Sequence, residues 1–92
     1  MQFPLIHLNG TDGDSLLADQ CDIARALRSA LEVMVANGPN ARDYYPLARG
    51  AYDKAREEHV ARMNAIRAVL ADVERIAEYL ASDPHTQLEM RS

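Results

Sequence analysis

Arginine, tyrosine and histidine side chains gather in the middle of the sequence, and their types suit the binding of an anion. They are Arg42, Tyr44, Tyr45, Tyr52, Arg56, His59 and Arg62. The guanidinium group of arginine can hold a phosphate or carboxylate through two parallel hydrogen bonds, and tyrosine rings stack on nucleobases. If residues 51–82 form a helix, Tyr52, Arg56 and His59 share one face of it, because positions three and four apart are neighbours. The spacing therefore predicts a pocket for an anionic small molecule such as a nucleotide.

The same residues also have a purely structural interpretation. Arg42 and Asp43 would form a salt bridge in a loop, and the tyrosines would cap the end of a helical bundle. His59 falls in the apolar heptad series of its helix, where a buried polar group specifies the register of packing. Such a group is either satisfied by a neighbour or lines a cavity. No specific motif decides between the two interpretations, so both remain open.

Residue types that carry catalysis in other proteins form no recognisable site in this sequence. Asp19 with Asp22, and Glu74 with Glu78, are carboxylate pairs one helical turn apart. Their order does not match the acidic pairs that hold magnesium on facing helices, and solvated helix faces account for them. Cys21 falls in an apolar stripe and is interpreted as a small core residue. We expect no enzymatic activity, no metal site and no cofactor.

The composition describes one small acidic domain. The chain has 92 residues and a net charge of −4, and alanine supplies much of its hydrophobic content. Residues 40–67 carry six Arg and Lys against four Asp and Glu, a net +2, whereas the segments on either side each carry −3. An acidic chain lacks the basic face that DNA or RNA requires, and no segment reaches the roughly 18 apolar residues of a membrane span. We therefore expect a cytoplasmic protein without nucleic-acid or membrane partners.

Hydrophobic periodicity and helix-breaking residues divide the chain into five segments. They are an extended apolar arm (1–10), a first helix (14–36), a loop with a short helical piece (37–50), a second helix (51–82) and a loose tail (83–92). Thr11 is the expected N-cap of the first helix, and Gly38 with Pro39 ends it. The short piece is expected to start at Pro46, with Asp43 as its N-cap.

The expected fold class is all-α, an antiparallel two-helix hairpin with an extended N-terminal arm. Two helices cannot cover both of their own faces, so we expect the chain to oligomerise as a dimeric four-helix bundle or a larger assembly. The second helix is the longer by about 10 Å at 1.5 Å per residue. We expect this overhang at its C-terminal end. There, Val73, Ile76, Ala77 and Leu80 would need a partner from the arm or from a second subunit.

Two loop motifs resemble small uncharacterised accessory proteins of tailed phages and prophages. They are His7-Leu8-Asn9-Gly10-Thr11 and Pro39-Asn40-Ala41-Arg42-Asp43-Tyr44-Tyr45-Pro46, followed on the second helix by Glu58-His59 and Arg62. The resemblance implies a cytoplasmic protein made inside an infected host, and it assigns no catalytic residues. Small phage proteins of this kind often sequester a nucleotide immune signal or cap a host protein.

Two functions are therefore expected, from different classes. The first is a non-enzymatic binding protein that sequesters an anionic, nucleotide-like ligand in the Arg/Tyr/His pocket. The alternative is a structural or protein-interaction module, a phage assembly factor or an inhibitor of a host protein, that binds no small molecule. The alternative predicts that charge reversal at Asp72, Glu74 and Glu78 removes activity, whereas the first predicts that Arg42→Ala removes binding.

Overall fold

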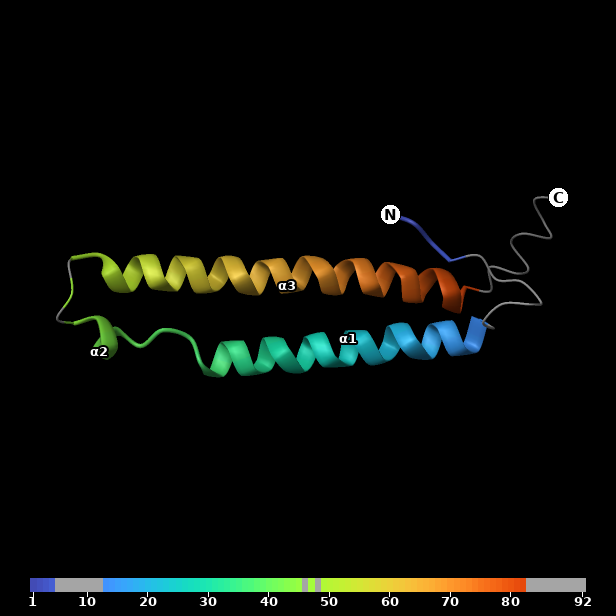
Figure 1. Ribbon diagram of the computed structural model, residues 1–92, viewed down its shortest axis with the longest axis horizontal. Coiled ribbons are helices and arrows are strands. Elements are labelled where there is room, and N and C mark those ends of the chain that lie inside the picture. The colour runs from blue at the N-terminus through green and yellow to red at the C-terminus, as the bar shows by residue number, and fades with distance from the viewer. Residues whose placement is uncertain (5–12, 46, 48, 83–92) are drawn as a thin grey trace.

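Two long helices that lie side by side dominate the computed structural model, which describes residues 1–4, 13–45, 47 and 49–82 (Figure 1). Helix α1 spans Gly13–Ala36, the single-turn helix α2 spans Ala41–Tyr44, and helix α3 spans Ala51–Ala81. All regular structure in this described part is helical, which confirms the all-α class. The bounds of the two long helices differ from the predicted ones by one residue at most.

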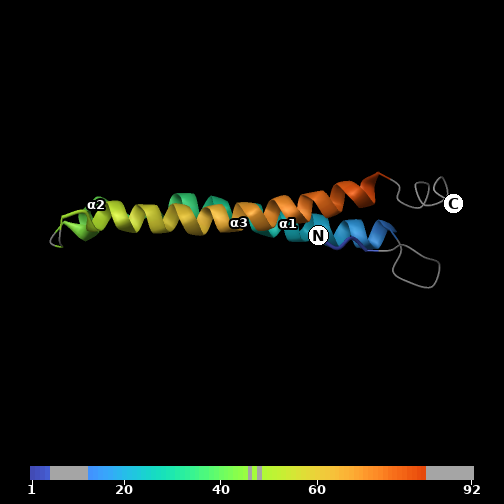
Figure 2. The same cartoon turned by 90° about the horizontal axis from the view of Figure 1, so that it is seen from above.

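Helices α1 and α3 run in opposite directions and pack against each other, and α2 contacts α3 near its beginning (Figures 1 and 2). Across this pairing, the side chain of Arg28 on α1 reaches Glu74 on α3. None of the helices described here is long and apolar enough to cross a membrane.

The core is a single apolar seam between α1 and α3. Four of the described residues are buried: Ala24, Met63, Val73 and Leu80. Half-buried residues continue the seam at three- and four-residue steps: Leu27, Leu31 and Met34 on α1, and Ile66 and Leu70 on α3. A pair of helices has one shared face, so each helix leaves the larger part of its surface outside the seam.

The predicted overhang at the C-terminal end of α3 is wrong. Val73 and Leu80 are only 8% and 6% exposed within the single chain, so they need no partner subunit. The extra length of α3 lies at its N-terminal end, where its first turns run past the end of α1 and beside α2 (Figure 1). The reason is the path of the connection, which continues beyond α1 through α2 before the chain turns back into α3.

The short helix lies earlier in the loop than predicted. Asn40 caps it, because the Asn40 side-chain oxygen accepts a hydrogen bond from the backbone N–H of Arg42 at 2.9 Å. Asp43, the predicted cap, lies inside α2, and residues 47, 49 and 50 are not helical. Gly50 precedes α3 with φ of +87°, a left-handed conformation that glycine adopts without steric cost. Pro46 and Thr11 lie outside the described residues.

The first residues of the chain return over α3. The ring of Phe3 stacks on the ring of Tyr79, with centroids 4.8 Å apart and planes inclined by 17°. This contact attaches the start of the predicted arm to its own chain. The rest of the arm, at residues 5–12, and the predicted tail, at residues 83–92, lie outside the described part of the structure.

Candidate functional site

The seven predicted ligand-binding residues lie at the end of the molecule where α2 meets the start of α3. Arg42 and Tyr44 belong to α2, and Tyr45 follows it directly. The other four, Tyr52, Arg56, His59 and Arg62, lie on the first turns of α3. The structure brings the rings of Tyr44 and Tyr52 together, with centroids 6.3 Å apart.

The remaining members of the set do not converge on one point. Tyr45 is 88% exposed, so its ring contributes to no enclosed pocket. Arg56 and Arg62 are six residues apart on α3, which places them about 120° apart around the helix, on opposite flanks of the buried seam. Arg62 also forms an ion pair with Glu58 at 3.7 Å, so its charge already has a partner. The geometry gives an open surface that carries arginine and tyrosine side chains.

His59 makes a specific contact with the end of α1. Its Nε2 atom lies 2.7 Å from the backbone oxygen of Met34. Since a carbonyl oxygen only accepts, Nε2 carries the hydrogen and donates it. The imidazole ring also lies against Gly38, where an added Cβ would come within 3.4 Å of the ring. His59 therefore satisfies a carbonyl in the last turn of α1, which supports the structural interpretation of this residue.

We expect His59→Ala to lower the free energy of unfolding by about 1–2 kcal/mol, because the substitution removes the hydrogen bond to Met34 and the contact of the ring with Gly38. His59→Gln keeps an N–H donor and should recover part of the loss. Thermal unfolding followed by circular dichroism would measure both, and about 1 kcal/mol corresponds to roughly 4–8 °C in a domain of this size. An unchanged melting temperature for His59→Ala would show that the contact contributes nothing to folding.

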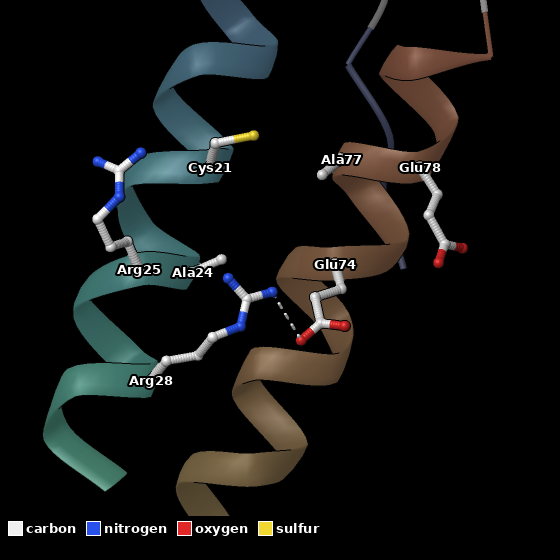
Figure 3. Close-up of a pocket in the computed structure, with 7 residues that line it drawn as sticks. All are labelled: Cys21, Ala24, Arg25, Arg28, Glu74, Ala77 and Glu78. Carbon is white, nitrogen blue, oxygen red and sulfur yellow. Dashed lines mark ion pairs between the residues drawn. The ribbon is translucent and has the colours of Figure 1, made fainter. Parts of the chain in front are cut away.

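A pocket that the sequence did not predict opens between α1 and α3, away from the Arg/Tyr/His residues (Figure 3). Its volume is about 320 Å³, and it is lined by Cys21, Ala24, Arg25, Arg28, Glu74, Ala77 and Glu78. The pocket forms because the two helices present small alanine side chains, Ala24 and Ala77, at this level. That pair of small residues is the signal in the sequence that could have indicated it.

Cys21 is exposed at this pocket, so its predicted place in the core is wrong. The seam on α1 passes through Ala24 and Leu27 and leaves Cys21 on its flank. The periodic pattern alone could not distinguish a seam residue from a flanking one, because both recur at three- and four-residue steps.

Three of the four charged residues that line the pocket form ion pairs. Arg28 forms an ion pair with Glu74 across the two helices at 3.4 Å (Figure 3). Arg25 bonds to Asp22 of its own helix at 2.8 Å. Two arginines and two glutamates balance each other, so the lining does not attract an anion. The described residues also contain no group of three or more His, Cys, Asp and Glu side chains placed to hold a metal ion.

The geometry thus gives an open Arg/Tyr surface at one end, a charge-balanced pocket on one side, and a very small core. Comparisons of the chain with protein-family models, with curated proteins and with solved structures found no match. The functional conclusion therefore follows from the chain's own packing and surface.

Proposed function

We propose that the chain is a non-enzymatic protein-interaction module, an antiparallel helical hairpin that associates with further copies into a helical bundle, most simply of four helices. The observation that carries this proposal is the size of the core, since four residues are buried in the described part of the chain. So little burial leaves a small margin over the conformational entropy lost on folding. Association with further copies would bury additional apolar surface and so stabilise the folded chain.

The apolar residues that the single chain leaves exposed support the same conclusion. Five valine and isoleucine side chains on the two long helices are more than two-fifths exposed: Ile23, Val33, Val35, Val60 and Val69. β-Branched residues have a lower helix propensity than alanine or leucine, so they bring no advantage to a solvated helix face. Contact with another helical surface would explain why some of these valine and isoleucine residues occur at exposed positions.

The experiment that tests the proposal is a mass measurement of the purified full chain over a range of concentrations. We expect the mass to be an integer multiple of 10.2 kDa. The melting temperature should also rise with protein concentration, because association stabilises the folded chain by mass action. A single-chain mass at every concentration, with a constant melting temperature, would contradict the proposal.

Sequestration of an anionic ligand is the second candidate, and the close Tyr44–Tyr52 ring pair beside the exposed Arg42 favours it. Calorimetry with a panel of nucleotides should detect binding that Arg42→Ala weakens about tenfold or more, as expected for loss of a charge-assisted hydrogen bond. Arg67→Ala is the matched control, because Arg67 bonds to Asn64 on α3, away from the ring pair. If the parent chain binds none of the nucleotides, this second candidate is excluded and the protein-interaction module is unaffected.

A further inference from the structure

We infer that the chain self-associates through one side of the α1–α3 pair, and that a second copy of the chain covers this side. The apolar side, as we name it, is formed by Ile23, Ala30 and Val33 of α1 and by Ala65, Val69 and Ile76 of α3. The inference rests on the proposed function and specifies the surface that the bundle would use.

On α1, the residues of the apolar side each directly precede a residue of the buried seam. Ile23 precedes Ala24, and Val33 precedes Met34. Because an α-helix turns by about 100° per residue, a step of one residue back from the seam always leads to the same flank. Ala30 lies seven residues after Ile23 and so occupies that flank as well. Ile23 is 44% exposed and Val33 is 61% exposed, so a large part of each residue remains accessible in the single chain.

The same relation holds on α3. Val69 precedes Leu70, and half-buried Ile76 precedes Ala77. Tyr79 precedes Leu80 in the same way, and Phe3 of the same chain stacks on it, so the C-terminal end of this flank is already covered. Ala65 falls on the same flank as Val69, one turn earlier, and Val69 is 49% exposed. Since α1 and α3 are antiparallel, a step back along either chain turns toward the same side of the pair (Figure 1). The two flanks therefore form one surface across both helices.

The opposite side of the pair has a different character, which we name the charged side. Arg25 and Arg28 follow the seam residues of α1 by one step, and Glu74 and Glu78 follow those of α3. All four line the pocket between the helices, and Arg28 and Glu74 form the ion pair across it (Figure 3). The position of the pocket is independent evidence that these residues share one side. The hairpin is therefore two-sided: one side carries charged residues around the pocket, and the other carries three exposed valine and isoleucine residues beside half-buried Ile76.

The side of the pair on which the apolar residues lie is large enough, with its polar rim, for a stable dimer. Over the 24 residues of α1 the whole side, rim included, is about 36 Å long, and two helices side by side are about 20 Å wide. The apolar residues occupy the central part of it, about 15–17 Å along each helix. Each copy would bury about 700 Å² and the pair about 1,400 Å², which lies within the usual range for specific interfaces. Charged residues lie at the ends and edge of this surface, at Asp19, Glu58, Arg62 and Asp72, as in an interface with an apolar centre and a polar rim.

A second copy is the occupant that fits this surface. A two-fold dimer needs the same self-complementary patch on both subunits, and the apolar side provides an apolar patch bordered by Arg62 and Asp72 of α3. Its three- and four-residue spacing repeats that of the seam, so a second hairpin can pack against it as α1 packs against α3. Both layers of the resulting four-helix bundle would then use the same packing.

Sedimentation equilibrium of the full chain with two matched substitutions on α3 tests this inference. Val69 and Val60 are 49% and 45% exposed, but Val69 lies on the apolar side and Val60, directly after His59, lies on the charged side. We expect Val69→Glu to raise the Kd of the dimer about 100-fold or more, because it places an unpaired charge in the interface. Val60→Glu should leave the Kd within about threefold of the parent value, as for a substitution outside the contact.

A second matched pair on α1 makes the test independent of any one variant's folding. Val33 lies on the apolar side and is 61% exposed, whereas Val35, after Met34, lies on the charged side and is 65% exposed. Val33→Glu should dissociate the dimer and Val35→Glu should not, with the helical circular dichroism signal retained in both. If the dimer persists in both Val69→Glu and Val33→Glu, the apolar side is not the interface, and the proposed function is left intact. A parent chain that is monomeric throughout would overturn both.

Discussion

Val73→Asp is expected to lower the free energy of unfolding by about 3–5 kcal/mol, the largest effect of any single substitution considered for this chain. Val73 is one of the four buried residues and is 8% exposed, on the face of α3 that packs against α1. The substitution removes apolar burial and places a carboxylate in the apolar seam, where the loss of its hydration is costly. Its sequence neighbour Glu74 has the same sign and is the residue to which Arg28, the cation across the helices, is already paired.

The measurement is urea unfolding followed by far-ultraviolet circular dichroism, with Ala71→Asp as the control. Ala71 lies two residues away on α3 and is exposed, so the control adds the same charge to the same helix without entering the seam. We expect the control to change stability by less than about 0.5 kcal/mol, as surface substitutions usually do. If the two variants unfold at the same urea concentration, the seam does not hold the helices together as described.

Leu80→Ala is expected to lower the free energy of unfolding by about 2–4 kcal/mol while leaving the mass of the oligomer unchanged. Leu80 is 6% exposed within a single chain, near the end of α3, so its burial belongs to the hairpin itself. The truncation loses the apolar area of the side chain and leaves a cavity between the helices. The effect on association should be small, because the apolar side does not include Leu80.

Two readouts separate the contributions of Leu80 to folding and to assembly. Denaturant unfolding at fixed protein concentration gives the stability, and the sedimentation mass gives the state of assembly. Leu47→Ala is the matched control, since Leu47 is 59% exposed in the loop before α3. A Leu80→Ala variant with parental stability but a reduced mass would show that this end of α3 is covered by a partner subunit, as the sequence alone had indicated.

Local chemistry allowed the helices to be predicted from the sequence. The apolar period and the breaker pair Gly38-Pro39 located the end of α1, and the observed bounds of both long helices differ from the prediction by one residue at most. The position of His59 in the apolar series of α3 was also visible, because it depends only on spacing along one helix. These features depend on interactions between residues close in sequence, which is why the sequence predicts them.

The candidate site was less predictable, because residues that share a helix do not necessarily face one point. Tyr44 and Tyr52 were predicted to share one pocket, and their rings do lie together, because α2 lies beside the start of α3. Arg56 and Arg62 were assigned to one site with His59 because each is three residues from it. The packed structure places His59 in the seam between them and separates the two arginines onto different flanks of α3.

The sequence by itself therefore determined the two helices, their ends and the apolar character of the faces that meet. Only the tertiary structure decided the offset between the helices, which buries Val73 and Leu80 within one chain and leaves Cys21 exposed. The physical reason is that periodicity fixes the direction in which a side chain points around its own helix. The offset along the axis depends on the path of the connection through α2 and on which small and large side chains fit together across the seam.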